Sequence, residues 1–213
     1  MTLPWTDFLT VWALLAVNIT SPGPNVLNTI ASAMGSGRAA GLGSALGVAL
    51  GIAVWCLGTT LGMAAVFALL PVAQLALTLI AVALLGRFAF RYLKAAVAGL
   101  RGDRRGVPQG RTGMSPRAAF IRSLQVSALN PKALTTWLAI VTIFPVARAQ
   151  GGDIALLCVG ASTLSLSIHT GYALAFSTAP AVRLYLRAAP WINGAVGLFF
   201  IGFALKLLAG VLH

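Results

Sequence analysis

The stretch Ser21-Pro22-Gly23-Pro24-Asn25 could do chemistry through its backbone, because it interrupts a long apolar run from Phe8 to Met34. Each proline lacks an amide hydrogen and crowds the turn before it, so a regular helix cannot pass through this stretch. An interrupted helix leaves amides and carbonyls without helical partners. In lipid, such groups are tolerated only where protein or a water-filled cavity satisfies them. We therefore interpret this break as a binding site.

A second break, Asn130-Pro131-Lys132, interrupts the apolar run from Ala118 to Phe144. Ser21 and Asn130 are both residue types that cap helix starts, and each precedes a proline, which is favoured at the first helical position. The two motifs lie 109 residues apart, as Ser21 and Asn130 show. We therefore predict that each motif restarts a helix in mid-span, at equivalent positions of an internal repeat.

Two helices that restart near the middle of a membrane would present their N-terminal ends to one central region. The free amides and the positive end of the helix dipole favour a carboxylate or another anion there. The carbonyls that end the preceding half-helices can accept hydrogen bonds from an ammonium group. The two breaks together therefore offer partners for both halves of an amino-acid backbone.

Lys132 and His169 are the two ionisable side chains predicted to lie inside the membrane near this region. A basic side chain at mid-span costs at least about 2.5 kcal/mol on insertion scales, which makes a functional role the first hypothesis. The alternative for Lys132 is a structural role, bonded to the carbonyls freed at Pro22. His169 is a candidate for carrying protons, with an ordinary contact between helices as the alternative. We interpret the serines and threonines of residues 154–177 as contacts between helices.

The composition is that of an integral membrane protein. Of the 213 residues, 59% are hydrophobic and 8% are charged, whereas soluble domains carry about 25% charged residues. No cleavable signal peptide is evident, and the net charge of +12 is explained by basic loops rather than by nucleic acid. Cys56 and Cys158 fall in different apolar runs without a C-x-x-C partner, so we predict that they are small buried hydrophobic residues.

Six apolar runs are long enough to span a bilayer. We predict an all-α fold of one transmembrane domain, with a repeat at about 5–97, a cytoplasmic loop at 98–115 and an inverted repeat at about 116–212. Pro71 and Pro180 are again 109 residues apart, which supports the repeat. The predicted helices cover about 5–34, 41–69, 72–97, 116–144 and 154–177, and a last helix that follows a connector from Pro180 to Pro190. The glycines at four-residue spacing in the second helix, Gly43, Gly47 and Gly51, and then Gly58 and Gly62, favour close helix packing.

The distribution of basic residues predicts the orientation. Ten lie in the first, third and fifth connections and two lie on the opposite side; the ten are Arg38, Lys94, Arg101, Arg104, Arg105, Arg111, Arg117, Arg122, Arg183 and Arg187, and the two are Arg148 and Lys206. Because positive residues concentrate on the cytoplasmic side, we predict that residues 98–115 are cytoplasmic and that both termini are outside. Three spans per repeat then make the halves inverted, which is a recurring transporter design.

These motifs resemble those of a known family. Pro22-Gly23-Pro24-Asn25, followed by Gly37-Arg38-Ala39-Ala40-Gly41-Leu42-Gly43, is similar to the opening signature of the LysE/RhtB family of amino-acid exporters. Asn130-Pro131-Lys132-Ala133 is similar to the family's second signature. The resemblance covers the whole chain in length, layout and basic central segment. It implies export of amino acids or close derivatives across the bacterial inner membrane, driven by the proton-motive force.

From the motifs we predict a transporter and not an enzyme, without catalytic residues, metal or cofactor. The partners we expect are an amino-acid substrate and membrane lipids, with no nucleic acid and with a homodimer left open. We expect a neutral substrate, because no acid lies in mid-span and Asn25 stands where the family often has Asp. The predicted substrate-binding residues are Ser21, Pro22, Gly23, Pro24, Asn25, Asn130, Pro131 and Lys132, with proton coupling at Lys132 and His169.

Two other classes share this kind of inverted repeat. A transmembrane thiol oxidoreductase would need paired cysteines near the helix breaks, and neither broken run contains a cysteine. A cation exporter would need carboxylates or rings of carbonyls, whereas Asp7, Asp103 and Asp153 lie near span ends or in loops. A membrane hydrolase has less support still, because no acid accompanies His169 inside a span.

Overall fold

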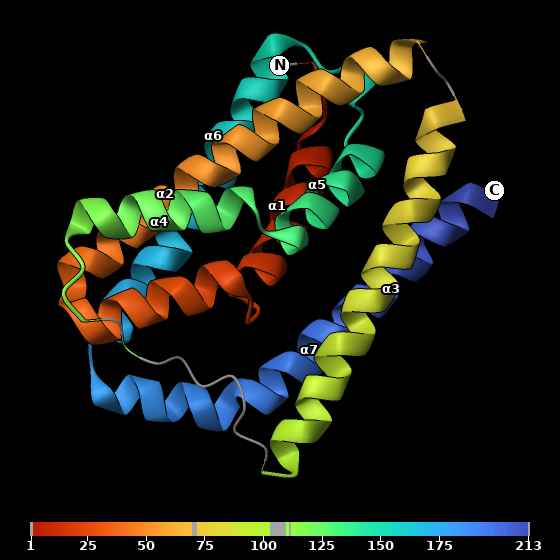
Figure 1. Ribbon diagram of the computed structural model, residues 1–213. Coiled ribbons are helices and arrows are strands. Elements are labelled where there is room, and N and C mark those ends of the chain that lie inside the picture. Colours follow the sequence, from red (N-terminus) through yellow and green to blue (C-terminus); the bar gives the residue numbers. More distant parts are fainter. Residues whose placement is uncertain (1, 70–71, 103–109, 111, 213) are drawn as a thin grey trace.

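The computed structural model describes residues 2–69, 72–102, 110 and 112–212. Every regular element in these ranges is a helix (Figure 1). The predicted turn at Pro71 lies outside the described residues, as do residues 103–109 and 111 of the central polar segment, which include Asp103, Arg104, Arg105 and Arg111. The elements are α1 (Trp5–Thr20), α2 (Pro24–Leu69), α3 (Val72–Leu100), α4 (Pro116–Ala128), α5 (Pro131–Ile143), η1 (Val146–Arg148), α6 (Gly151–Ala175) and α7 (Ala179–Leu212).

Helices end and restart at both proline motifs. α1 ends at Thr20, Ser21 is extended with φ −75° and ψ 143°, and α2 begins at Pro24. The prediction that Ser21 caps the restarted helix is therefore wrong, because Ser21 ends α1, whereas Asn130 caps α5 as predicted. α4 ends at Ala128, and α5 begins at Pro131. A proline at the first helical position loses nothing, because its missing amide hydrogen would have no helical partner there.

Gly37 divides α2 into two arms that fold back on each other (Figure 1). Its φ of 81° lies in the left-handed region, which glycine adopts without the penalty that other residues pay. The second arm runs beside α4, and Gly43 and Gly47 lie directly against the carbonyl oxygens of Pro116 and Phe120. The close approach predicted from the glycine spacing therefore holds for the first part of this arm.

The rest of the glycine series behaves differently. A methyl group at Gly58 or at Gly62 would meet no atom of another helix within 4 Å among the described residues. In this part of the chain the two glycines are not in a close helix contact, although they follow the same sequence pattern. The spacing identifies candidates for close packing, and the position of the neighbouring helix decides which of them are used.

α3 and α7 lie alongside each other over much of their lengths (Figure 1). The prediction of a connector between Pro180 and Pro190 is wrong, because both residues belong to α7. Pro180 is tolerated since it lies in the first helical turn. Pro190 is inside the helix and packs against Gly99 of α3, where glycine leaves room for the proline ring.

The prediction that Cys56 and Cys158 are unbonded hydrophobic residues is also wrong. The structure joins them in a disulfide between α2 and α6, with their Cα atoms 5.6 Å apart. Both side chains are buried. Their 102-residue separation gave no local signal, and the pair forms because α2 and α6 pack together along their lengths.

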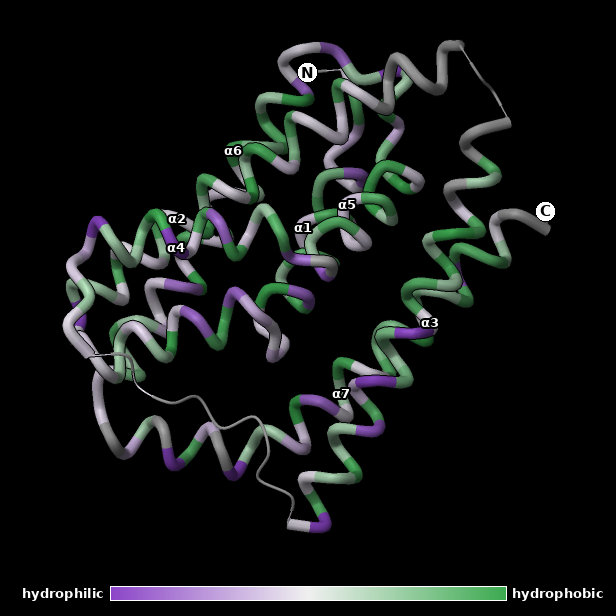
Figure 2. Tube along the Cα trace, viewed as in Figure 1, coloured by the Kyte–Doolittle hydropathy of each residue, from purple (hydrophilic) through white to green (hydrophobic). Residues whose placement is uncertain are grey.

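The apolar side chains fill a core and also cover the outside. Phe8 of α1 and Phe144 after α5 make an edge-to-face contact inside the core, with ring centroids 5.4 Å apart. Figure 2 shows that hydrophobic positions recur along every long helix, and large apolar side chains such as Leu46 of α2 and Leu198 of α7 are exposed. Three segments of the described chain are long and apolar enough to cross a membrane, namely Pro24–Gly62, Gly151–Ala175 and Arg187–Gly210. The six-span layout, the inverted repeat and the orientation stay predictions.

Candidate functional site

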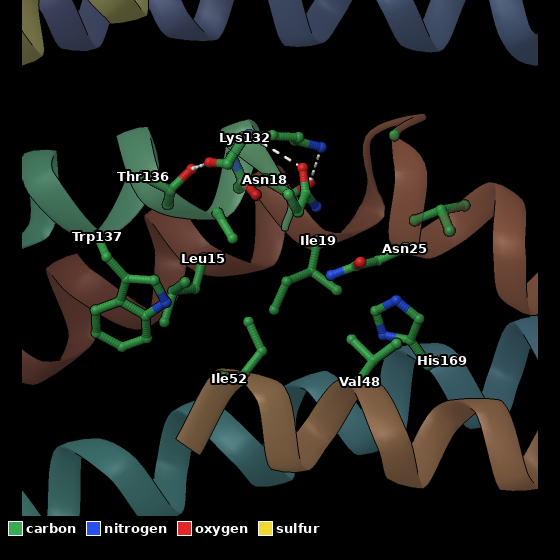
Figure 3. Close-up of a pocket in the computed structure, with 14 residues that line it drawn as sticks. Leu15, Asn18, Ile19, Asn25, Val48, Ile52, Lys132, Thr136, Trp137 and His169 are labelled. Atoms are coloured by element: carbon green, nitrogen blue, oxygen red, sulfur yellow. Dashed lines mark hydrogen bonds between the residues drawn. The ribbon is translucent and has the colours of Figure 1, made fainter. Parts of the chain in front are cut away.

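The two helix breaks meet at the side chain of Lys132 (Figure 3). Its Nζ donates to the carbonyl oxygens of Asn18 (2.7 Å) and Ser21 (3.1 Å), and to Ser21 Oγ (2.5 Å). The two carbonyls lie at the end of α1, where the break has removed their helical partners and where the helix dipole is negative. A lysine from the second break therefore neutralises the helix end left by the first.

These three bonds use all the hydrogen atoms of the Lys132 ammonium group. The side chain is buried, and Nζ lies 5.5 Å from the centroid of the Tyr92 ring, at the distance of a cation–π contact. The Tyr92 hydroxyl in turn donates to the Pro22 carbonyl (2.7 Å). This geometry is the one expected for the structural alternative, in which Lys132 binds the carbonyls freed at Pro22.

The start of α5 is capped by its own residues. The backbone amide of Lys132 donates to Asn130 Oδ1, and the amide of Ala133 donates to the Asn130 carbonyl, each at 3.0 Å. This differs from the expectation that both helix starts offer free amides to a ligand. At the start of α2, the first hydrogen bond within the helix runs from the amide of Leu27 to the carbonyl oxygen of Gly23 (2.9 Å). The backbone amides of Asn25 and Val26 come before it, so α2 leaves them without a helical partner.

A cavity lies beside the two breaks (Figure 3). It is lined by Leu15, Asn18, Ile19, Gly23, Asn25, Val26, Val48, Ile52, Asn130, Lys132, Ala133, Thr136, Trp137 and His169. The space within it that the centre of a water molecule can occupy is about 30 Å³. One water needs about 10–15 Å³ by this measure, so the cavity holds about two waters. An amino acid therefore requires the helices around it to move apart.

The sequence-predicted site residues fall into two groups around this cavity. Gly23, Asn25, Asn130, Lys132 and His169 line it. Three others do not: Ser21 is fully buried and bonded to Lys132, Pro22 presents its carbonyl to Tyr92, and Pro24 is exposed at the start of α2. Pro131 begins α5. Their roles as ligands stay predictions.

Sequence reasoning missed several lining residues. Val48 and Ile52 come from the second arm of α2, which reaches the cavity only because the chain folds back at Gly37. Asn18 donates to Thr136 Oγ1 (2.7 Å), and Thr136 Oγ1 donates to the Lys132 carbonyl (2.7 Å). A signal for Asn18 was present, because it is a polar residue one turn before the break in an apolar run.

Three polar atoms of the lining residues have no hydrogen-bond partner among the described residues. They are Asn25 Oδ1, Trp137 Nε1 and His169 Nε2. Trp137 and His169 are 0% and 1% exposed, so bulk water does not satisfy them. A buried polar group without a partner costs about 1–3 kcal/mol and calls for an explanation such as a bound water or a ligand.

A chain of polar side chains continues from the cavity between α2 and α4. Asn25 Nδ2 donates to Ser127 Oγ (3.5 Å), and one turn further Asn28 Nδ2 donates to Ser123 Oγ (2.6 Å). Arg122 Nε then donates to Asn28 Oδ1 (3.3 Å). Arg122 is exposed, so this chain connects the cavity region with the surface of the molecule.

The fold and site define an all-helical membrane protein, with two interrupted helices that meet beside a mixed polar and apolar cavity. The family model described as LysE type translocator matches residues 16–210. The chain therefore belongs to the LysE family, whose members are membrane transporters that export amino acids or related compounds. No curated protein matches the chain, and no solved structure does.

Proposed function

We propose that this protein is a secondary exporter of neutral amino acids or close derivatives. The observation that carries the proposal is the cavity beside the two breaks, which combines apolar walls with unpaired donors and acceptors. A neutral amino acid has an uncharged side chain, an ammonium group that donates and a carboxylate that accepts. The free amides at the start of α2 and the positive charge of Lys132 favour the carboxylate.

The charge of the site favours a substrate without net charge. Among the described residues, no Asp or Glu lines the cavity, whereas the positively charged Lys132 does. A second cation at about 8 Å from Lys132, in an effective dielectric of about 20, is disfavoured by about 2 kcal/mol. A zwitterion avoids this term because its own carboxylate accompanies its ammonium group.

The acids seen in the structure have other tasks. Asp153 accepts bonds from the amide of Thr2 (2.9 Å) and the amide of Gln150 (3.0 Å), so it fixes the start of α6. Asp7 lies in the first turn of α1. Neither is a lining residue, which makes a cation exporter a weaker reading. The cysteines are joined to each other and also do not line the cavity, so a thiol oxidoreductase has less support than an exporter.

The location and energy source belong to this proposal. The protein resides in the bacterial inner membrane with residues 98–115 in the cytoplasm and both termini outside, as the basic residues indicate. The proton-motive force drives export, and Lys132 and His169 are the ionisable groups among the described lining residues that could couple proton movement to substrate. The small cavity implies that inward-open and outward-open forms alternate around it.

The experiment is efflux from cells loaded with labelled amino acids, expressed with this chain or with an empty vector. We expect faster loss of neutral amino acids such as leucine, threonine or homoserine. Lysine and arginine serve as the matched charged substrates. Equal efflux of every amino acid from both strains would refute export, and faster efflux of the basic pair would refute the preference for neutral substrates.

A further inference from the structure

His169 presents an unpaired acceptor to the cavity. Its Nδ1 lies 2.9 Å from the carbonyl oxygen of Ser165. A carbonyl only accepts hydrogen bonds, so Nδ1 carries the hydrogen atom, and in the neutral ring Nε2 has a free lone pair. The buried ring thus offers an acceptor at Nε2, without a partner among the described residues.

Asn25 supplies a second unpaired acceptor. Its Nδ2 faces Ser127 Oγ at 3.5 Å, which leaves Oδ1 as the end of the amide without a partner in the described chain. Asn25 and His169 both line the cavity and lie on the same side of it in Figure 3. Trp137, whose unpaired atom is a donor, lies on the other side in that view. The unused acceptors are therefore grouped on one side.

Three other acceptors near the breaks already bind donors. The carbonyls of Asn18 and Ser21 hold the ammonium of Lys132. Asn130 Oδ1 accepts from the Lys132 amide. A ligand ammonium group that enters the cavity in this arrangement therefore finds its acceptors at His169 and Asn25, and not at the end of α1.

We propose that His169 Nε2 and Asn25 Oδ1 bind the primary ammonium group of a zwitterionic amino acid. The identification of the ligand as an amino acid rests on the proposed function. In this arrangement the ligand's carboxylate faces the backbone amides of Asn25 and Val26 at the start of α2, which have no helical partner. Lys132 keeps its hydrogen bonds to Asn18 and Ser21, and it acts on the ligand's carboxylate through its charge alone.

The histidine content of the chain permits a direct test. The chain has two histidines, His169 and the last residue, His213. Purified protein labelled with ¹⁵N-histidine gives imidazole resonances for both, and the variant His213→Ala assigns those of His169. We expect the free protein to show a neutral ring with hydrogen on Nδ1, because the Ser165 carbonyl accepts from it.

The probes are L-leucine and L-threonine, each compared with its N,N,N-trimethyl betaine. The betaine keeps the side chain and the zwitterionic charge but has no N–H donor. We expect either amino acid to shift the His169 Nε2 resonance saturably, while the betaines leave it unchanged. The substitution Asn25→Leu should weaken binding by about tenfold or more, since a hydrogen bond to a charged group contributes about 1.5–3 kcal/mol.

The proposal is overturned if His169 carries its hydrogen on Nε2 in the free protein. It is also overturned if neither amino acid shifts the resonance, or if a betaine shifts it as much. Efflux separates this result from the proposed function. Amino-acid export without a His169 response removes the ammonium site and leaves the exporter, whereas a His169 response without export removes the exporter and leaves the site.

Discussion

The contact between α2 and α4 can be tested by placing a methyl group on Gly47. A Cβ atom there would overlap the carbonyl oxygen of Phe120 and lie 3.0 Å from Ser123 Cβ. Both neighbours belong to α4, and the first is backbone, which cannot turn aside as a side chain can. The substitution Gly47→Ala must therefore push the two helices apart. The matched control is Gly58→Ala, in the same arm, where the new methyl group meets no other helix of the described structure within 4 Å.

The two substitutions should change stability in opposite directions. Replacing glycine by alanine inside a helix stabilises it by about 0.5–1 kcal/mol. Overpacking a tight contact costs about 1–3 kcal/mol. Gly58→Ala should therefore raise the free energy of unfolding by up to about 1 kcal/mol, whereas Gly47→Ala should lower it by about 0.5–2 kcal/mol. Denaturant unfolding of the detergent-solubilised proteins measures both values.

Gly47→Ala should also slow efflux, because the adjacent Val48 lines the cavity and the arm carrying it is displaced. Gly58→Ala should leave efflux unchanged. A Gly47→Ala protein as stable as the Gly58→Ala protein would show that α2 and α4 do not approach each other as closely as they do in the structure. Equal destabilisation by both substitutions would show that the effect comes from losing glycine and not from the contact.

Four further predictions follow from the site and the topology. Lys132→Ala should abolish efflux while the protein still inserts, and Lys132→Arg should be impaired because a planar guanidinium does not fit the three acceptors of one ammonium group; normal efflux by an inserted Lys132→Ala protein would show that the lysine is not required. A protease site inserted within residues 98–115 should yield two halves that stay together on a denaturing gel until a reductant breaks the bond between Cys56 and Cys158; Cys158→Ser should release them without reductant, and separation of the unsubstituted halves would refute the disulfide. Trp137→Phe, which removes the unpaired indole donor and keeps the ring, should slow efflux of substrates with an acceptor on the side chain more than efflux of leucine, and an equal loss would place its role in packing. A reporter fused at Arg104 should be cytoplasmic, and an outside signal would reverse the predicted orientation.

The features that depend on local chemistry were predictable from the sequence. A proline cannot donate to the preceding turn, so the ends of α1 and α4 could be placed near Pro22 and Pro131 without knowing their neighbours. Gly37 was expected in a turn, and its left-handed backbone explains why. The connector through Pro180 was mispredicted for a related reason, since a proline in the first turn of a helix breaks nothing.

The features that depend on packing were not predictable. Cys56 and Cys158 carry no sequence signal for each other, and only the contact between α2 and α6 brings them together. Gly47 and Gly58 belong to one sequence pattern, yet of these two only Gly47 has another helix against it among the residues that the structure describes. The unpaired nitrogen of His169 was likewise invisible, because a sequence does not reveal which of the two ring nitrogens finds a partner.

The position of Lys132 explains how a site without acids can hold a cation. Its counter-charges are the carbonyl dipoles at the end of α1, so the side chain is solvated by backbone and not by a carboxylate. Partial charges satisfy hydrogen bonds but do not cancel a full charge at a distance, so the cavity keeps a positive field. Such a field attracts a carboxylate and repels a free ammonium group, which leaves the ammonium of a zwitterion to bind on the side of the cavity where acceptors are unused. Lys132, which binds the carbonyls at the end of α1, thereby also sets the orientation in which an amino acid binds in the cavity.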